Sequence, residues 1–290
     1  MIDARRRRVL SVVALSIVAL SLTACGKSAQ DAEPTTEATA ASCAADSLAT
    51  LESGVLTIGT DKPAYEPWFN NDDPSNGKGY EAAVAYAVAK QLGFSADQVK
   101  WTVAPFSTVI APGEKAFDFD INQVSITDER KQAVDFSSGY YDVKQAIITV
   151  KGSKIAGAKT LADLKGAKLG GQIGTTSYKV ITDLIKPTQE PGAFDTNDVA
   201  KQALANGQID GLIVDLPTAF YITAVELDNG VILGQFENTT VGEQFGLVLN
   251  KGSKLTTCVS KAVDELRADG TLAAIEQQWL SQVVSAPVLK

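Results

Sequence analysis

Short apolar runs alternate with amphipathic stretches along most of this chain. The runs end at Gly, Asn or Asp, as buried strands do, whereas the stretches between them repeat apolar residues at helical spacing. The strands predicted in this way are 55–59, 99–103, 119–122, 146–150, 168–172, 211–214 and 245–249. The predicted helices are 80–92, 198–207, 254–269 and 271–280, with one more that ends before Pro187. This alternation predicts an α/β fold in which helices connect the strands of the sheets.

Residues 1–24 read as an export signal and not as part of the fold. Arg5–Arg8 form a basic segment, and residues 9–20 form an apolar segment too short for a typical membrane span. Leu22-Thr23-Ala24-Cys25 follows and has the pattern of a bacterial lipobox. We expect cleavage before Cys25 and lipidation of its thiol, with an uncleaved anchor as the alternative and the general and twin-arginine export routes both open.

The mature protein is therefore expected outside the cytoplasm, lipid-anchored to the bacterial cell membrane. Residues 25–50 would comprise the lipidated cysteine and a flexible tether, because the segment is rich in Ala, Thr, Ser and Glu and lacks bulky apolar residues over most of its length. The full sequence has a formal charge of −8, and loss of residues 1–24 removes four arginines and one aspartate. Such an acidic protein disfavours nucleic acid as a partner and gives no polybasic adhesion to anionic lipid.

Composition limits the chemistry. With 290 residues and 45% hydrophobic content, the chain can bury a core for about two compact units. The sequence contains no histidine, which excludes Ser-His-Asp and Cys-His catalysis and His-rich metal sites. No metal and no cofactor is expected.

One of the three cysteines is expected to carry the lipid, and the other two can form a disulfide. If Cys25 is acylated, Cys43 and Cys258 remain as an even pair in an oxidising exterior, which favours a disulfide between them. The alternative is that Cys258 is a buried thiol, since it lies on the apolar stripe of a predicted helix. Cys43 lies in a polar segment, where a core role does not explain it.

The residues with the most specific chemistry follow the strand at 119–122. Ser125 comes just after the strand, and Thr127 is placed to cap a helix that begins near Arg130. A guanidinium beside a hydroxyl and free backbone N–H groups can bind a carboxylate through two parallel hydrogen bonds. The alternative is a surface arginine paired with Asp128 or Glu129.

This segment resembles the cleft segment of the bacterial family 3 solute-binding proteins, the polar amino acid-binding proteins of ABC importers. The family pattern T-I-T-x-E-R-x-x-x-V-D-F-S-x-x-Y-Y corresponds to Ser125–Arg130, Val134–Ser137 and Tyr140-Tyr141. The resemblance continues in register at Ile58–Asp61 with Tyr65 and Phe69, Gly79–Glu81, Leu164–Gly166, Gln172–Thr176, Val214-Asp215 and Leu266–Leu272. It implies a two-lobed periplasmic-binding-protein-like fold of type II, with the ligand cleft between the lobes.

The resemblance also implies how the chain is divided. The chain would cross between the lobes near 141–145 and near 241–246, so that lobe 1 is 51–143 with 243–290 and lobe 2 is 144–242. Ligands in open α/β sheets lie at the carboxyl ends of strands. The strand ends placed around one cleft in this way carry Asp61, Asn122, Gly174 and Asp215.

The charged ends of an amino acid would each meet an opposite charge. By resemblance, Arg130 and the Ser125 hydroxyl bind the carboxylate from lobe 1, and Thr175 and Thr176 add backbone N–H groups at the start of a helix in lobe 2. Asp215 would bind the ammonium, helped by the Gln123 carbonyl. Helix capping is the alternative for the Gly-Thr-Thr segment and for Asp215.

The ligand side chain would lie against Asp61, Tyr65 and Phe106, while Trp68 and Phe69 belong either to this pocket or to the core. Asp61 favours side chains with N–H donors, such as those of Gln, Asn, Arg and Lys, unless it caps the local turn or Lys62 reverses the preference. The sequence departs from the family in several places, which leaves the ligand open. Glu81 replaces the usual Asp, Asn122-Gln123 replaces a small pair, two residues are added near 62–64, and 70–76 is rich in Asn and Asp.

The function implied is that of a monomeric receptor, without catalytic residues, that closes on a polar amino acid and delivers it to an ABC permease. The alternative is an enzyme on the same scaffold, a cyclohexadienyl dehydratase-like protein that acts on arogenate or prephenate. Its general acid could be Glu66 or Glu81, but neither lies in a motif that we can match.

Overall fold

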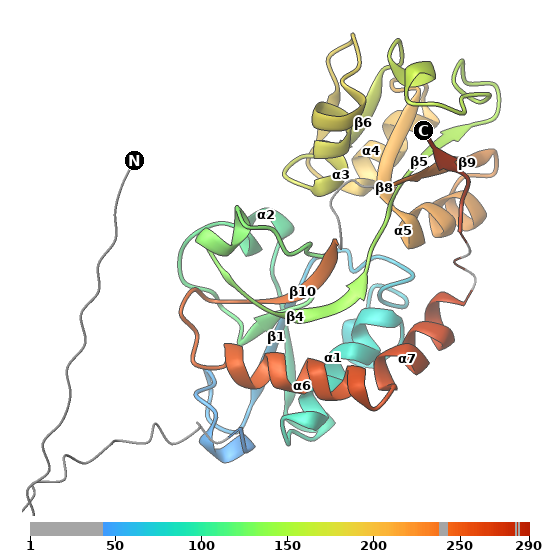
Figure 1. Ribbon diagram of the computed structural model, residues 1–290. Helices are drawn as coiled ribbons and strands as arrows, with labels where there is room; N and C mark the ends of the chain where they lie inside the picture. The colour runs from blue at the N-terminus through green and yellow to red at the C-terminus, as the bar shows by residue number, and fades with distance from the viewer. Residues whose placement is uncertain (1–42, 238–242, 282, 284) are drawn as a thin grey trace, which may run out of the picture. The chain divides into compact units, whose positions relative to one another are not determined.

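The strands form two separate sheets, each at the centre of one lobe (Figure 1). The computed structural model describes residues 43–237, 243–281, 283 and 285–290. The lobe 1 sheet has the strand order β2-β1-β3-β10-β4, and the lobe 2 sheet has the order β11-β9-β5-β8-β6-β7. The α/β fold in two lobes that the sequence predicts is thus confirmed. Within the described residues, no helix is both long and apolar enough to span a membrane.

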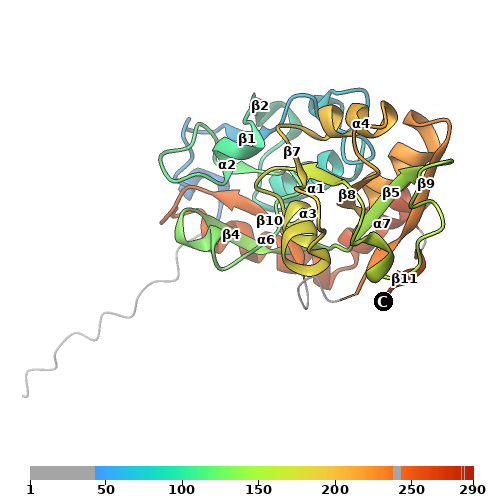
Figure 2. The ribbon, with the colours of Figure 1, turned by 90° about the horizontal axis from the view of Figure 1, so that it is seen from above.

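Lobe 1 has a mixed sheet in which β1 pairs in parallel with β2 and β3, and β10 runs antiparallel to β3 and β4. Figure 2 shows β4 and β10 side by side. The strands are β1 (Leu56–Thr60), β2 (Val99–Val103), β3 (Phe119–Asp120), β4 (Asp135–Asp142) and β10 (Gln244–Leu249). The helices are α1 (Tyr80–Gln91), α2 (Phe106–Val109), α6 (Thr256–Ala268) and α7 (Thr271–Leu280).

The core of lobe 1 is aromatic where α1 meets the sheet. The Trp68 ring contacts Tyr80, Tyr141 and Phe245 edge-on, with centroids 5.9, 5.5 and 5.5 Å apart. Such edge-to-face pairs add to the free energy gained by burial alone. Trp68 and Phe69 are fully buried in this cluster, so they belong to the core and not to the ligand pocket.

Lobe 2 has a sheet covered on both faces. Successive side chains of a strand point to opposite faces, and β8 shows the result: Leu212 and Val214 join one apolar cluster while Ile213 joins another. The strands are β5 (Gln145–Val150), β6 (Leu169–Gln172), β7 (Gly192–Phe194), β8 (Gly211–Asp215), β9 (Gly230–Phe236) and β11 (Val288–Leu289). The helices are α3 (Thr176–Lys179, extended by a π-helix over Val180–Ile185), α4 (Asn197–Ala205) and α5 (Leu216–Tyr221, extended over Ile222–Glu226).

The C-terminal end departs from the expected division of the chain. We expected 243–290 to belong to lobe 1, but β11 pairs in parallel with β9 of lobe 2, with Val288 opposite Gln235 and Leu289 opposite Phe236. The pairing satisfies backbone groups at the edge of β9 and buries the Leu289 side chain in the core of lobe 2. The chain therefore crosses between the lobes once more after α7, and the expectation is wrong for these last residues.

The segment before β1 is packed from residue 43 onward. Cys43 and Cys258 form a disulfide with an S–S distance of 2.01 Å and a Cα–Cα distance of 5.4 Å. Ala45 and Leu48 pack against the lobe 1 core beside it. The expectation of a flexible tether over 25–50 is therefore wrong for 43–48, because the disulfide and these apolar contacts hold them. The predicted signal, Cys25 and residues 26–42 of the tether lie outside the described residues.

Candidate functional site

A cleft lies between the two lobes. Its volume is about 330 Å³, part of which is open to solvent. Its lining comes from loops and strand ends of both lobes: Asp61, Tyr65, Phe106, Asn122 and Gln123 of lobe 1, and Gln172, Thr175, Asn197 and Asp215 of lobe 2. Six of the nine predicted ligand residues are among them. The other three, Ser125, Arg130 and Thr176, lie beside the cleft and are connected to it by hydrogen bonds.

Arg130 is buried next to this cleft with 8% of its surface exposed. Its Nη1 donates to the Ser125 carbonyl oxygen at 2.7 Å, and its Nη2 donates to the Gly174 carbonyl oxygen of lobe 2 at 3.0 Å. The guanidinium carbon lies 5.3 Å from the centroid of the Phe106 ring, a cation–π contact. The expected helix after Arg130 is only a 3₁₀ turn over Arg130–Gln132, with Thr127 Oγ1 accepting from the Arg130 N–H at 3.1 Å.

The Arg130 guanidinium keeps its charge. Burial lowers its pKa to about 10, and the nearby carboxylates of Glu243, Asp215 and Glu129 act in the opposite direction. The two acids that offered a simpler explanation pair with lysines instead. Asp128 lies 3.1 Å from Lys131 Nζ, and Glu129 lies 2.7 Å from Lys179 Nζ. Among the salt bridges of the described residues, Arg130 therefore forms none with Asp128 or Glu129, and its side-chain N–H groups donate to backbone carbonyl oxygens.

Ser125 is involved in an unexpected polar contact. Its Oγ donates to Oε1 of Glu243 at 2.7 Å and lies 3.2 Å from Thr176 Oγ1 across the lobes. Gln145 Nε2 approaches the same Glu243 oxygen at 3.3 Å. Glu243 and Gln145 are buried at the points where the chain crosses between the lobes, and neither was among the predicted site residues. The available signal was a charged and an amide residue within the crossing segments.

Asp215 lies at the end of β8 and in the N-cap position of α5. Its side chain makes no cap hydrogen bond; instead Oδ1 accepts from Gln145 Nε2 at 2.6 Å. The capping alternative therefore does not describe this carboxylate. Burial raises the pKa of Asp215 to about 8, and the negative charge of Glu243 adds to the shift.

Thr175 does cap a helix. Its Oγ1 accepts from the Tyr178 N–H at 3.0 Å and donates to the Gln172 carbonyl oxygen at 2.6 Å. The capping alternative is thus correct for this hydroxyl, although Thr175 also lines the cleft. Thr176 Oγ1 lies within hydrogen-bond distance of Ser125 and, at 3.4 Å, of Gln145 Nε2.

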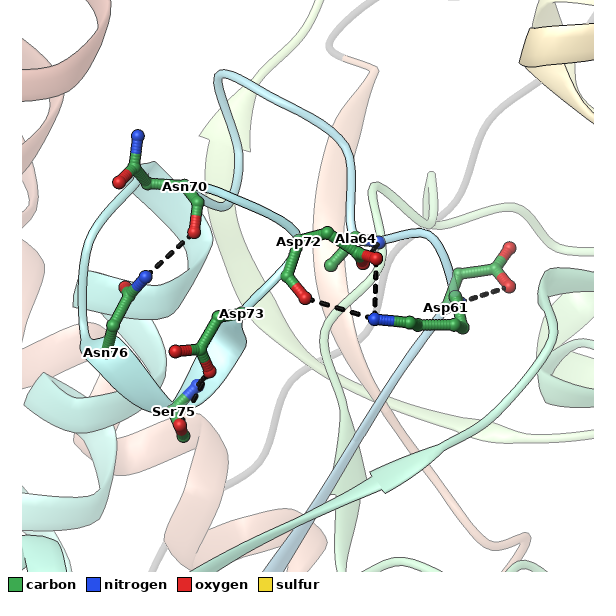
Figure 3. Close-up of polar contacts among 8 residues, drawn as sticks. Asp61, Ala64, Asn70, Asp72, Asp73, Ser75 and Asn76 are labelled. Atoms are coloured by element: carbon green, nitrogen blue, oxygen red, sulfur yellow. Dashed lines mark hydrogen bonds and ion pairs between the residues drawn. The ribbon is translucent and has the colours of Figure 1, made fainter.

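Asp61 both lines the cleft and caps a turn. Its Oδ1 accepts from the Lys62 N–H at 2.8 Å, and its Oδ2 accepts from the Phe106 N–H at 3.4 Å. Burial raises the pKa of Asp61, and these hydrogen bonds oppose the shift. The Lys62 side chain turns elsewhere, with Nζ 2.5 Å from Asp72 Oδ2. Figure 3 shows the Asp61 carboxylate pointing away from the loop that carries Asp72, so Lys62 does not neutralise it.

Gln123 is hydrogen-bonded to the buried carboxylate of Glu81, the first acidic residue of α1. Glu81 Oε1 accepts from the Gln123 backbone N–H at 2.8 Å, and Oε2 accepts from Gln123 Nε2. The Tyr140 hydroxyl donates to Oε1 as well. Burial raises the pKa of Glu81 to about 7 against the effect of these three hydrogen bonds.

Three lining residues, Asn122, Gln172 and Asn197, were not among the predicted ligand residues. Asn122 and Gln172 follow or end predicted strands, so the rule that ligands lie at strand carboxyl ends already pointed to them. Asn197 begins α4 and had no comparable signal.

Residues 56–282 match the family described as bacterial extracellular solute-binding proteins, family 3. The chain is 30% identical over 237 residues to the L-cystine-binding protein TcyJ of Escherichia coli (strain K12), covering 81% of this chain and 85% of that protein. It is similar to the solved structure of an ancestral arginine-binding protein bound to glutamine, with a TM-score of 0.66, 32% identity, and coverage of 79% of this chain and 98% of that one. It is also similar to the ancestral amino acid-binding protein AncCDT-1, a precursor of cyclohexadienyl dehydratase, with a TM-score of 0.63, 28% identity, and coverage of 78% and 95%.

Proposed function

The chain belongs to the family 3 bacterial extracellular solute-binding proteins, and on that premise we propose that it binds a polar L-amino acid between its lobes and delivers it to an ABC importer. One observation carries the proposal. A buried cation of lobe 1, Arg130, packs against the Phe106 ring of the cleft wall, and a carboxylate of lobe 2, Asp215, lines the same cleft. An amino acid has one group of each charge at a fixed separation, so such a pair of opposite charges suits it.

The carboxylate of the ligand would be bound at the Arg130 end of the cleft. The guanidinium donates there to two backbone carbonyl oxygens, and a ligand carboxylate is the stronger acceptor for a planar fork of donors. The Ser125 hydroxyl and the backbone N–H groups of Thr175 and Thr176 would add donors.

The ammonium would be bound by Asp215. This carboxylate must be ionised to do so, and an approaching ammonium favours the ionised form because opposite charges lower the pKa of an acid. The backbone carbonyl oxygen of Gln123 would supply a further acceptor on the lobe 1 side of the cleft. The side chain of the ligand would lie against Asp61, Tyr65 and Phe106, which together offer one carboxylate and two aromatic rings.

The protein acts as a receptor and not as an enzyme. Dehydration of prephenate or arogenate needs a general acid beside the leaving hydroxyl. Both oxygens of Glu81 accept hydrogen bonds from Gln123 and Tyr140, and Glu66 does not line the cleft. Incubation with each compound should give no turnover, and formation of the dehydrated product would contradict the proposal.

The receptor would be a monomer outside the cytoplasm, attached to the membrane by a lipid on Cys25. The acidic charge of the chain supports the lipid as the means of attachment, since it gives no attraction to anionic lipid. Cys25→Ser should then abolish partitioning into detergent. Unchanged partitioning would exclude the lipid anchor.

A thermal-shift screen over the amino acids tests the proposal as a whole. A ligand at about 100 times its Kd adds about 2.7 kcal/mol to the free energy of unfolding, which gives a measurable rise in Tm. We expect a rise with one or a few polar amino acids. If none of them raises Tm or binds in calorimetry, the proposed function is wrong.

A further inference from the structure

Three hydrogen-bond donors converge on the buried carboxylate of Glu81. The Gln123 backbone N–H and the Tyr140 hydroxyl both point at Oε1, and the Gln123 side-chain Nε2 points at Oε2. Glu81 is fully buried, so its carboxylate depends on these partners in place of water. Two of the three donors belong to a single residue of the cleft wall.

The backbone of Gln123 has an unfavourable conformation that its surroundings must stabilise. Its φ is +48°, in the left-handed region that residues other than glycine rarely adopt. The bond from its N–H to Glu81 holds the backbone there, and the bond from Nε2 holds the side chain. Glu81 thereby fixes both the place of Gln123 and the direction of its amide.

The direction of the amide decides what the cleft offers to a ligand. Because the NH₂ end of Gln123 is turned to Glu81, the carbonyl oxygen is the end left for the cleft that Gln123 lines. Among the hydrogen bonds of the described residues, none reaches this oxygen. The carboxylate of Asp61, which lines the same cleft, also only accepts.

We propose that Glu81 is a positioning residue for ligand selectivity: it turns the Gln123 carbonyl towards the cleft, so that this wall accepts hydrogen bonds from the ligand side chain. This inference rests on the proposed function and narrows it to a class of ligand. The side chain that fits carries N–H donors at its end, as a guanidinium, an ammonium or a carboxamide does. A side chain that ends in a carboxylate finds no donor at Gln123 or Asp61.

The variant E81Q reverses this arrangement by a predictable route. Two donors converge on Oε1, so the amide oxygen of the new side chain takes that place and its NH₂ faces Gln123 Nε2. Two donors cannot share a hydrogen bond, so the Gln123 amide must turn and present its NH₂ to the cleft. The wall then donates where it accepted before.

The measurement is the ratio of Kd for arginine to Kd for glutamate, by calorimetry at pH 8.5, where Glu81 is ionised. The α-carboxylate and α-ammonium are common to both ligands, so the ratio reports the side chain alone. We expect the wild type to bind arginine more tightly than glutamate. E81Q should raise this ratio, in favour of glutamate, by roughly ten- to a hundred-fold, which is the effect of one hydrogen bond to a charged group.

Matched variants separate positioning from general damage. Tyr140→Phe removes the third donor from Glu81 without touching the Gln123 amide, and it should leave the ratio unchanged. Gln123→Met removes the amide and should shift the ratio towards glutamate. Adding E81Q to that variant should have no further effect on the ratio, because a double-mutant cycle isolates the coupling between the two side chains.

Several results would overturn the inference: tighter wild-type binding of glutamate, an equal loss for both ligands in E81Q, or an unchanged ratio in Gln123→Met. The last comparison holds even if E81Q does not fold. These outcomes differ from failure of the proposed function, in which the wild type binds no amino acid at all.

Discussion

The Ser125 hydroxyl of lobe 1 lies 2.7 Å from Oε1 of Glu243 and donates its only hydrogen to it. A ligand carboxylate that is bound by Ser125 must therefore replace Glu243 as the acceptor. The negative charge of Glu243 also acts on Arg130 and Asp215, the two residues proposed to bind the charged ends of the ligand. One buried acid at the crossing between the lobes would thus compete with a ligand carboxylate, and its charge adds to the burial that raises the pKa of Asp215.

We expect Glu243→Gln to tighten amino acid binding at pH 7. The change removes a competing anion from Ser125 and Arg130, and it removes one cause of the raised pKa of Asp215. Each pKa unit recovered at Asp215 is worth about tenfold in affinity, so the gain should be of that order. Calorimetry on Glu52→Gln provides a control, because Glu52 is exposed, pairs with Lys100 and does not line the cleft. Weaker binding in Glu243→Gln would contradict this view of the site.

Arg130→Ala should abolish binding while the fold survives. Removal of one partner of a desolvated charge pair costs roughly 2–5 kcal/mol of binding free energy. Arg130→Lys should also bind poorly, since an ammonium cannot make two parallel hydrogen bonds to a carboxylate. Calorimetry gives the affinity, circular dichroism checks the fold, and Lys179→Ala serves as an exposed cationic control. Near-normal affinity in Arg130→Ala would falsify the assignment.

Local sequence signals predicted much of the fold. Helix α7 was predicted with the bounds that the structure has, because Gly270, at a φ of 83°, separates it from α6. Strand β4 was not predicted as a strand, since its sequence DFSSGYYD shows no apolar alternation and its pairing with β10 decides its state. Strand β11 has two residues, and its partner β9 lies more than fifty positions earlier, so no local pattern marks it.

The residues of the candidate site also fall into those that the sequence predicted and those that it did not. Asp61, Gln123 and Asp215 line the cleft where the strand-end rule and the resemblance put them. Glu243 and Gln145 were missed because their contacts depend on two crossing segments that meet only in the folded chain. Sequence motifs identify residues that line the cleft, but not the groups that set the charge and orientation of those residues.

The affinity should depend on pH through Asp215. Its pKa is raised to about 8, so below that value it is protonated and offers no charge to the ligand ammonium. Affinity should rise about tenfold per pH unit from pH 6 towards 8, because the binding-competent fraction rises at that rate. Calorimetry across this range measures the slope, and Asp215→Asn should bind weakly with a flat profile. A flat profile in the wild type would exclude Asp215 as the titrating group.

The stability of the ligand-free protein should change in the opposite direction. The folded protein holds a proton on Asp215 that the unfolded chain releases at lower pH, so the unfolded state binds fewer protons between the usual range of Asp and about pH 8. This residue therefore lowers the free energy of unfolding as the pH rises through that window. Urea titrations should show a smaller decline in Asp215→Asn than in the wild type.

Reduction of the Cys43–Cys258 disulfide should destabilise the protein. The bond joins residues separated by 215 positions, and loss of so long a loop closure costs on the order of 2–5 kcal/mol in a model whose entropic basis is disputed. Urea unfolding with and without reductant measures the cost. Neither cysteine lines the cleft, so ligand affinity should persist under native conditions. In Cys25→Ser protein unfolded without reductant, thiol titration should find no free cysteine; two would exclude the bond.

Asp61→Asn should weaken binding of ligands with cationic side chains. Lys62 is paired with Asp72, so the Asp61 carboxylate presents its charge to the cleft without a neutralising neighbour. The carboxamide oxygen can still accept one of the two turn hydrogen bonds, from Lys62 N–H or Phe106 N–H, which limits damage to the turn. Loss of a hydrogen bond to a charged group costs about 1.5–3 kcal/mol, so arginine and lysine should lose roughly ten- to a hundred-fold in affinity.

Competition calorimetry with arginine, glutamine and glutamate distinguishes this role from a structural one. Glutamate should gain affinity in Asp61→Asn, because removal of a like charge from the cleft removes its repulsion. Asp72→Asn tests the role of Lys62 separately: it removes the charge that pairs with Lys62 Nζ and changes no residue that lines the cleft. The Asp72 backbone carbonyl oxygen still accepts from Lys62 Nζ at 3.2 Å, so Lys62 should stay in place and the ligand preference should change less than in Asp61→Asn. If glutamate binds the wild type most tightly and Asp61→Asn leaves that order unchanged, Asp61 does not select the ligand, and the choice must come from Gln123 and the aromatic wall.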